Sequence, residues 1–319
     1  MKIIFFGTPE IAVPFLEFLY TNEEIVTVVT QPDREAGRGR EIVPSPVKLF
    51  AQNKGLTIFQ PAGTDELTAF LNKLPFELGV VVAYGKILSL ELLKTAKIGF
   101  VNVHFSLLPK YRGAAPAQWA VINGERETGV TTFWIDEGLD TGKIISQKKV
   151  IIENDDTVST LQKELVVLGI EVLKETLKLI KENPQIGYEQ QGIPSYAPPL
   201  KKENGKIYWQ EKTAQEIYNL IRGTQPWPGV FTVVKSEKCK LKSLKILEAK
   251  VVDFNLTPYT LHLTPGSIVG LEKGKGFIVK CKTEFLLILK VQEEGKKITS
   301  AWDYWQGAKL KIGDILGGI

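Results

Sequence analysis

The sequence predicts an α/β fold: a doubly wound, mostly parallel sheet with helices on both faces, followed by a smaller β-barrel domain. Two observations lead to this expectation. Through the first 188 residues, short apolar runs alternate with helical stretches, which is the pattern of parallel strands joined by crossover helices. From residue 205 onward, short apolar runs are separated by Gly and Pro, which is typical of a small barrel of short strands.

The first element is the stretch KIIFFGTPEIAVPFLEFLY, in which a continuous apolar run predicts a strand buried on both faces. Gly7 and Thr8 form the turn, and Pro9 suits the first turn of a helix. Further strands are expected in EIVTVVTQP, ELGVVVAYG and FVNVH, with helices between them in SPVKLFAQNKG and LSLELLKTAKIG. Ligands of such sheets bind beyond the carboxyl ends of the strands, so residues at those ends are the first candidates for a site.

The next stretch completes the first domain and leads out of it. GVTTFWIDEGLDTGKII predicts two strands around a Gly-rich loop, and the residues from DDTVST to LIKEN predict a long amphipathic helix. The chain then has four prolines and no helical period, which predicts a linker. We therefore expect a first domain over residues 1–188, a linker over residues 189–204 and an OB-like β-barrel domain over residues 205–319.

Composition excludes several classes of protein. Hydrophobic residues make up 44% of the chain and charged residues 24%, which is globular composition. No apolar run reaches the roughly 18 residues of a membrane helix, and the apolar N-terminal run is too short for a signal peptide, so a cytoplasmic protein is expected. Cys239 and Cys281 have no Cys or His nearby, which gives no support to a metal or redox site.

Charge is spread unevenly along the chain. From Gly205 onward there are 18 Lys and Arg against 11 Asp and Glu, whereas the first 204 residues hold 22 against 25. A basic C-terminal third indicates a polyanionic partner, although a solvated Lys-rich surface would give the same count. Lysines alternate along the predicted strands and so share one face. The tryptophans of this region are expected in its core: Trp227, Trp302 and Trp305.

Asn102 and His104 interrupt the apolar strand FVNVH where it ends. Strand residues two apart share a face, so both side chains point the same way. A hydrogen-bonded pair that caps the strand would explain an isolated motif of this kind. Here SLLPKYRGAAP follows, and DEGLDTG places Asp140 at the end of another predicted strand. An amide, an imidazole and a carboxylate that keeps the imidazole charged are the parts of an acyl-transfer site without a covalent nucleophile.

NVHFSLLPKYRGAAP and DEGLDTG together resemble the signature of the folate-dependent formyltransferases. IIFFGTPEIAV, TQPDREAGRGR, VPSPVK, VVVAYGKIL and the PWPG region resemble the tRNA-modifying members of that family, so the resemblance covers nearly the whole chain. It implies that the formyl group of 10-formyltetrahydrofolate passes to the free amino group of methionyl initiator tRNA, for translation initiation. It also implies no metal, no dinucleotide, no membrane contact and a monomer.

The resemblance also implies roles for individual residues. It makes Asn102, His104 and Asp140 catalytic, with Asn102 and a protonated His104 stabilising the oxyanion. Phe105 departs from the family, which usually has a small residue or Pro before SLLP. The implied folate contacts are Val82, Ala83, Tyr84, Gly85, Ile87, Ser106, Leu107, Leu108, Pro109, Asp136 and Gly138. The implied tRNA contacts are Arg34, Arg38 and Arg40 in the basic loop DREAGRGR, and Lys240 and Lys242 near the C-terminal strands.

Other functions would use parts of this pattern. A folate-dependent formyltransferase for amino-sugar nucleotides would share the catalytic residues but would not need the Arg and Gly residues of 33–40. A 10-formyltetrahydrofolate hydrolase usually carries an N-terminal regulatory domain, whereas Met1 here leads directly into the first strand. A non-catalytic RNA-binding protein would not need the three catalytic residues. Dinucleotide binding by the Rossmann-like sheet is disfavoured because GxGxxG is absent and Pro9 occupies the turn.

Overall fold

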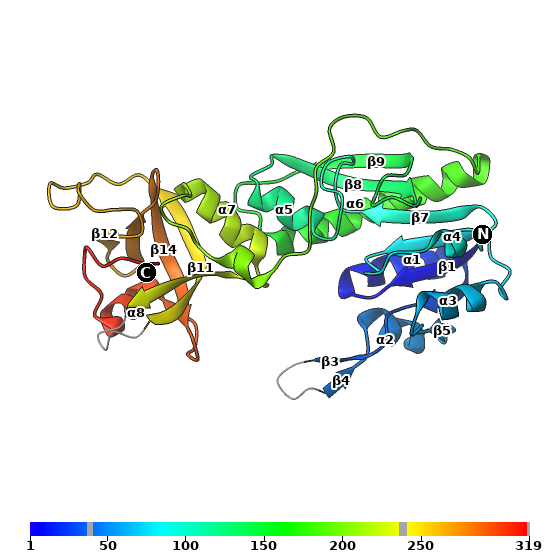
Figure 1. The fold of residues 1–319 in the computed structure, drawn as a ribbon, viewed down its shortest axis with the longest axis horizontal. Helices are drawn as coiled ribbons and strands as arrows, with labels where there is room; N and C mark the ends of the chain where they lie inside the picture. The colour runs from blue at the N-terminus through cyan, green and yellow to red at the C-terminus, as the bar shows by residue number, and fades with distance from the viewer. Residues whose placement is uncertain (37–40, 236–240, 318–319) are drawn as a thin grey trace. The chain divides into compact units, whose positions relative to one another are not determined.

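The computed structural model describes residues 1–36, 41–235 and 241–317. Two compact units interleave along the chain (Figure 1). The first contains residues 1–116, 127–151 and 161–198, and the second contains residues 117–126, 152–160 and the chain from residue 199 onward. The domain limits at residues 188 and 205 stay a prediction.

The sheet of the first unit has the strand order β5-β2-β1-β6-β7-β8-β9 within the described residues. The pairs from β5 to β7 along this order are parallel, and β8 is antiparallel to both β7 and β9. The prediction of a mostly parallel sheet is therefore confirmed. The strands are β1 (Lys2–Gly7), β2 (Glu24–Val29), β5 (Ile58–Phe59), β6 (Leu78–Val82), β7 (Gly99–His104), β8 (Glu127–Trp134) and β9 (Ile144–Ile151).

Helices cover both faces of this sheet, as a doubly wound fold requires (Figure 1). On one face, α3 and α4 pack against the buried rings of Phe6 and Phe100. On the other face, Gly169 of α6 approaches Phe15 of α1 and Val130 of β8. The helices of this unit are η1 (Glu10–Ala12), α1 (Val13–Asn22), α2 (Pro46–Asn53), α3 (Thr64–Leu71), α4 (Leu90–Leu93) and most of α6 (Val158–Glu182). Almost all of α5 (Pro116–Ile122) belongs to the second unit.

Two short strands project from the first unit beside α2. β3 (Arg34–Ala36) and β4 (Glu41–Val43) form an antiparallel pair on either side of residues 37–40. The basic loop predicted over residues 33–40 thus begins as a hairpin strand.

The second unit is built on an antiparallel sheet with the order β10-β11-β14-β13-β12, and β15 pairs with β14. Its core gathers Ile217 and Leu220 of α7, Tyr304 of α8 and Phe277 and Ile288 of the sheet. A smaller, barrel-like β domain follows the α/β unit, as predicted. Its elements are η2 (Lys202–Gly205), α7 (Ala214–Thr224), β10 (Val230–Lys235), β11 (Leu241–Val252), β12 (Ile268–Glu272), β13 (Gly276–Lys280), β14 (Phe285–Glu293), β15 (Thr299–Ser300) and α8 (Ala301–Ala308).

The predicted placement of the tryptophans was right in part. Trp305 packs against the core of the second unit. Trp227 is 60% exposed, so the expectation that it is a core residue was wrong. The ring stands between Pro226 and Pro228, after α7 ends, where no strand or helix turns it inward.

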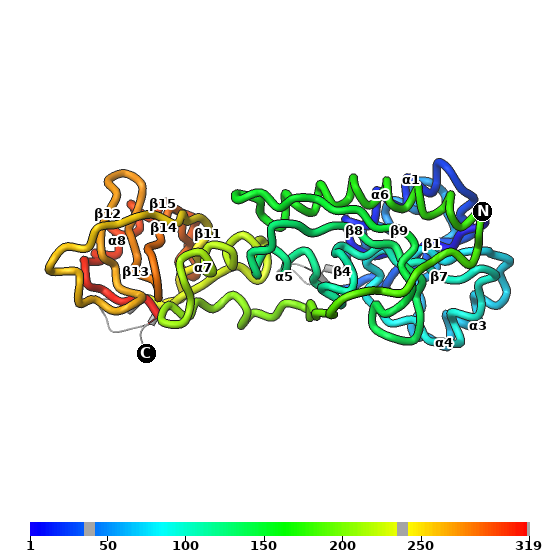
Figure 2. Tube along the Cα trace, turned by 90° about the horizontal axis from the view of Figure 1, so that it is seen from above, coloured from blue at the N-terminus to red at the C-terminus, as the bar shows by residue number. Residues whose placement is uncertain are grey.

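After α6 the chain returns along the opposite side of β8 and β9 (Figure 2). Tyr188 and Ile144 exchange backbone hydrogen bonds of 2.8 and 2.9 Å, which fix the start of this return. The segment then reaches the loop that follows β7. Among the described residues, no helix is both long enough and apolar enough to cross a membrane.

Candidate active site

The centre of the site is the carboxyl end of β7, where Asn102 and His104 lie. Asn102 pairs with Phe133 of β8 across the sheet, so these two side chains share a face. The His104 ring lies on the same face, because its centroid is 6.3 Å from that of Phe133 in an edge-to-face arrangement. The prediction that Asn102 and His104 point the same way agrees with this packing.

The two ring nitrogens of His104 each face a hydrogen-bond acceptor. Nε2 lies 2.9 Å from the backbone oxygen of Tyr111, and Nδ1 lies 3.7 Å from Oδ2 of Asp140. The same Oδ2 accepts a hydrogen bond of 2.7 Å from the backbone N–H of Gly113. The structure therefore brings Asp140 to His104, 36 residues away in the sequence, and adds two groups from the loop after β7.

The charge expected on His104 is not the one that its surroundings favour. Burial lowers the pKa of His104, because a cation is poorly solvated there, while Asp140 and the Tyr111 carbonyl raise the pKa in part. Burial is the larger effect, so the pKa lies below the ordinary value of 6.5 and the imidazole is neutral at neutral pH. The expectation of a His104 already protonated in the free protein was wrong, because it counted the carboxylate and left out the burial.

Asn102 is placed differently from His104. Its side chain is partly exposed, and it makes no hydrogen bond with any residue that the structure describes. Its amide N–H groups therefore remain available to a ligand oxygen, whereas both nitrogens of His104 already face protein acceptors.

Two residues that contact His104 have left-handed backbones. Tyr111 has a φ of 61° and Asp140 a φ of 53°, a region in which L-residues other than Asn and Asp are rare. For Tyr111 this backbone costs on the order of 1–2 kcal/mol, whereas an Asp such as Asp140 adopts it more readily. Strain of this kind persists only where neighbouring structure imposes it, and it concentrates at functional sites.

The loop predicted to bind the folate begins where β6 ends at Val82. Ala83 and Gly85 have φ values of 47° and 81°, and the Tyr84 carbonyl accepts hydrogen bonds from Thr8 Oγ1 at 3.1 Å and Gln31 Nε2 at 2.8 Å. Burial raises the pKa of Tyr84 to about 12. Ile87 is 84% exposed, so the loop presents an apolar side chain to solvent.

The second predicted folate loop leads into Asp140. Oδ1 of Asp136 accepts hydrogen bonds from the Gly138 N–H at 3.1 Å and from Thr141 Oγ1 at 2.6 Å. A Cβ on Gly138 would lie 1.9 Å from Thr141 Oγ1, so this turn needs glycine. Asp136 and Gly138 are exposed. They follow Ile135, whose N–H bonds the Phe100 carbonyl, so this loop leaves β8 beside the start of β7.

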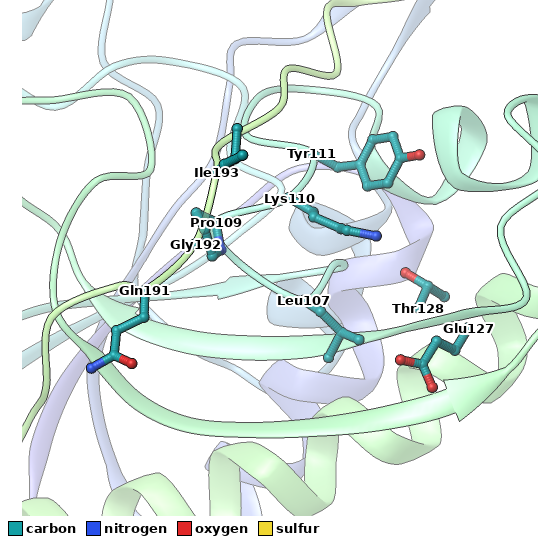
Figure 3. Close-up of a pocket in the computed structure, with 9 residues that line it drawn as sticks. All are labelled: Leu107, Pro109, Lys110, Tyr111, Glu127, Thr128, Gln191, Gly192 and Ile193. Carbon is teal, nitrogen blue, oxygen red and sulfur yellow. The ribbon is translucent and has the colours of Figure 1, made fainter.

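The four residues after Phe105 divide between the interior and a surface pocket. Ser106 and Leu108 are buried; Ser106 Oγ donates to the Lys110 carbonyl at 2.6 Å, and the Leu108 N–H donates to Thr131 Oγ1 at 3.2 Å. Leu107 and Pro109 instead line a pocket of about 260 Å³ between this loop, the start of β8 and the returning chain (Figure 3). The other residues that line it are Lys110, Tyr111, Glu127, Thr128, Gln191, Gly192 and Ile193.

Phe105 fits the fold without disturbing His104. It follows His104 directly after β7 ends. Its ring is 9% exposed and lies 6.1 Å from the Phe15 ring of α1. An aromatic residue at this position thus fills the core beneath α1.

The residues predicted to contact tRNA are placed only in part. Arg38, Arg40 and Lys240 lie outside the described residues. Arg34 is exposed on β3, and its guanidinium donates to Gln31 Oε1. Lys242 on β11 forms an ion pair of 2.6 Å with Glu293, so a protein carboxylate already offsets its charge.

Sequence reasoning missed several groups around His104: Tyr111, Gly113, Gln190 and Ser195. Ser195 Oγ accepts the Tyr111 N–H at 2.9 Å, and Gln190 Nε2 donates to the Asp140 carbonyl at 2.8 Å. Gln190 and Ser195 fall in the predicted linker, where proline content was the only signal read. Among the described residues, no group of three or more His, Cys, Asp and Glu side chains is placed to hold a metal ion.

Comparison with known families places both parts of the chain. Residues 1–177 match the model of the family "Formyl transferase", and residues 199–309 match "Formyl transferase, C-terminal domain". A methionyl-tRNA formyltransferase of Ruminiclostridium cellulolyticum is 42% identical over 99% of this chain and 100% of its own length. One of Pelotomaculum thermopropionicum is 43% identical over 99% of both chains.

Solved structures share the fold at lower identity. WlaRD, a sugar 3N-formyl transferase crystallised with dTDP and 5-N-formyl-tetrahydrofolate, superposes with a TM-score of 0.65 at 24% identity, over 93% of this chain and 99% of that one. HypX from Aquifex aeolicus in complex with tetrahydrofolic acid gives 0.63 at 15% identity, over 98% of this chain and 48% of that one.

Proposed function

The chain belongs to the formyl transferase family, and we propose that it transfers the formyl group of 10-formyltetrahydrofolate to the amino group of methionyl initiator tRNA. The observation that carries the chemistry is the buried His104 held between Asp140 and Tyr111, on the same face of β7 as the Asn102 amide, which bonds no residue that the structure describes. The full-length relatives named methionyl-tRNA formyltransferase support the choice of acceptor.

Two loops of the first unit fit a folate co-substrate. Residues 83–87 offer left-handed backbone at Ala83 and Gly85 and the exposed apolar side chain of Ile87. Residues 136–140 offer exposed backbone close to Asp140. A pterin presents an apolar face and a polar edge, and these two loops supply groups for both. WlaRD and HypX were crystallised with folate compounds, which supports the same co-substrate here.

Asn102 stabilises the charge that develops on the formyl oxygen. As the amine nitrogen bonds to the formyl carbon, the π electrons of the carbonyl move to its oxygen, and the Asn102 amide donates a hydrogen bond there. A donor that is already in place costs no reorganisation at the moment of reaction. The oxygen then reforms its double bond, and the bond from the formyl carbon to N10 of the folate breaks.

His104 moves the proton. The attacking amine must lose a proton and N10 must gain one, so a neutral imidazole that takes the first at Nδ1 and returns it balances the reaction. Nδ1 is the basic nitrogen because Nε2 already donates its proton to the Tyr111 carbonyl. Once protonated, the ring faces the Tyr111 carbonyl at Nε2 and the Asp140 carboxylate near Nδ1, both suited to a cation. The transient imidazolium also adds positive charge beside the oxyanion. Asp140 therefore orients the ring and stabilises its charged form.

The basic residues supply the contacts with the nucleic acid. We assign contacts with the phosphate backbone of the acceptor stem to two groups of residues. The first is Arg34, Arg38 and Arg40, and the second is the lysines of the C-terminal region, including Lys240 and Lys242. Contacts of this kind position the substrate without reading its sequence. We retain residues 1–188, 189–204 and 205–319 as the proposed catalytic domain, linker and tRNA-binding domain.

The experiment is formyl transfer from 10-formyltetrahydrofolate, with methionyl initiator tRNA and a dTDP-linked amino sugar offered as competing acceptors. We expect transfer to the tRNA, and a loss of rate on the order of 10²–10³ in Asn102→Ala. Thermal unfolding of the variant shows whether the fold is kept. Transfer to the sugar alone would overturn the acceptor, and a normal rate in a folded Asn102→Ala would overturn the mechanism.

A further inference from the structure

The segment of residues 190–197, which we call the strap, lies along the loop that follows His104. Its backbone pairs with residues 109–115 of that loop, and Figure 3 shows Gly192 and Ile193 next to Pro109. Four backbone hydrogen bonds join the two segments: Ser195 N to Pro109 O at 3.3 Å, Arg112 N to Ser195 O at 2.8 Å, Ala197 N to Arg112 O at 2.7 Å and Ala115 N to Ala197 O at 3.1 Å.

Two side chains of the strap extend this pairing toward His104. Ser195 Oγ accepts the Tyr111 N–H at 2.9 Å. Gln190 Nε2 donates to the carbonyls of Asp140 at 2.8 Å and Gly142 at 2.9 Å. Gln190 Oε1 accepts hydrogen bonds from Nε and Nη2 of Arg112, at 3.2 and 2.7 Å. One glutamine thus joins the Asp140 loop to the loop after β7.

These two contacts meet the two residues of the site that have left-handed backbones. Tyr111 and Asp140 both have left-handed backbones, and they provide the two groups that face the His104 ring nitrogens. Strained backbone of this kind needs surrounding structure to hold it. Ser195 bonds the backbone N–H of Tyr111, and Gln190 bonds the backbone carbonyl of Asp140.

We propose that Gln190 and Ser195 are positioning residues for the proposed formyl transfer, acting through the backbones of Asp140 and Tyr111 to fix both groups that face His104. The inference rests on the proposed function for its kinetic consequence. The structural part of the inference is independent of that function. It states that the strap, which contains none of the three catalytic residues, fixes the groups around the His104 imidazole. Groups that hold a ligating or reacting side chain in place govern its chemistry without touching the substrate.

Variants of the strap test this role separately from a general loss of fold. Gln190→Met removes every side-chain hydrogen bond, whereas Gln190→Glu keeps the acceptors for Arg112 and removes the donors to Asp140 and Gly142. Ser195→Ala removes the acceptor of the Tyr111 N–H, and Ser195→Thr restores a hydroxyl. Gln306→Met is the matched control, because Gln306 is exposed on α8, lies outside the strap and makes no side-chain hydrogen bond among the described residues.

The first readout is kinetic. We expect Gln190→Met, Gln190→Glu and Ser195→Ala to lower kcat by about 10- to 100-fold, as outer-shell partners do, with KM for both substrates nearly unchanged. Ser195→Thr and Gln306→Met should keep wild-type kcat. A normal kcat in a folded Gln190→Glu would show that the hydrogen bond from Gln190 to the Asp140 carbonyl does not position the site, because this variant still accepts the hydrogen bonds of Arg112.

The second readout does not depend on catalysis. The chain has two histidines, His104 and His262, so NMR of labelled imidazoles follows His104 directly once His262→Gln identifies the other signal. The groups that face the His104 ring are the Asp140 carboxylate, the Tyr111 carbonyl and the Phe133 ring. Displacing Asp140 or Tyr111 should lower the pKa of His104, because both raise it in the wild type.

The two readouts distinguish a failure of this inference from a failure of the proposed function. If the wild type transfers no formyl group to methionyl-tRNA, the proposed function fails, and the NMR titration still tests the strap. If Gln190→Glu and Ser195→Ala are folded and their His104 titrates as in the wild type, the strap does not position the imidazole.

Discussion

At the scale of single residues, His104 is governed by burial and by a carboxylate that act in opposite directions on one proton. Burial lowers the pKa, and Asp140 offsets only part of that effect. The free protein thus holds a neutral imidazole between two acceptors that suit its charged form. This arrangement favours protonation of His104 during the reaction over protonation before the substrates bind.

The pH dependence of the rate follows from the direction of that shift. The neutral imidazole is required, so kcat should be constant through neutral pH and fall only below about the unperturbed pKa of 6.5. Asp140→Asn should move this acidic limb to still lower pH, because the charge that raises the pKa is gone, and should also lower the plateau. Rate profiles between pH 5 and 8 test this. An acidic limb above pH 6.5, or one that moves upward in Asp140→Asn, would contradict it.

Gly85 tests the folate loop at the same scale. Its φ of 81° disfavours any side chain, and an added Cβ would lie 2.9 Å from Gln31 Nε2, which bonds the Tyr84 carbonyl. Gly85→Ala should therefore raise KM for 10-formyltetrahydrofolate and destabilise the fold by about 1–2 kcal/mol. KM for the tRNA should stay the same, since the loop is assigned to the folate alone. An unchanged folate KM would remove Gly85 from the folate site.

At the scale of elements, the helix α7 begins with a reciprocal cap. Thr213 Oγ1 accepts the Glu216 N–H at 3.1 Å, and Glu216 Oε2 accepts the Thr213 N–H at 2.8 Å. Thr213→Ala removes one side of this capping box and should lower the free energy of unfolding by about 1 kcal/mol. Urea unfolding followed by circular dichroism measures the change. An unfolding midpoint equal to that of the wild type would show that other contacts determine where α7 begins.

The elements that the sequence predicted well are those with a local cause. β1, β7 and α6 follow from continuous apolar runs and from a helical period, which neighbouring residues alone determine. Contacts of the strap have no local signal: Tyr111 and Ser195 are 84 residues apart, and Asp140 and Gln190 are 50 apart. The charge of His104 was misjudged for a related reason, since burial depends on residues that the motif does not contain.

At the scale of the whole molecule, the distribution of charge predicts that the two substrates bind with different dependence on salt. The chain has a net charge of +4, and the residues from Gly205 onward carry an excess of basic residues. Binding of tRNA should therefore weaken steeply as salt rises, because contacts with phosphates release counterions. The proposed folate contacts are confined to residues 83–87 and 136–140, so the KM for 10-formyltetrahydrofolate should change little over the same range. A tRNA KM that does not respond to salt would contradict a phosphate-binding role for the basic C-terminal region.

The strap also bears on how the polypeptide can be divided. The predicted domain limit at residue 188, like the family match that ends at residue 177, would leave Gln190 and Ser195 on the C-terminal piece. A fragment cut there would keep Asn102, His104 and Asp140 yet lose the segment that holds two of their neighbours. The smallest fragment with an intact reaction centre should extend through residue 198. The residues that the reaction needs therefore continue past the end of the family match at residue 177.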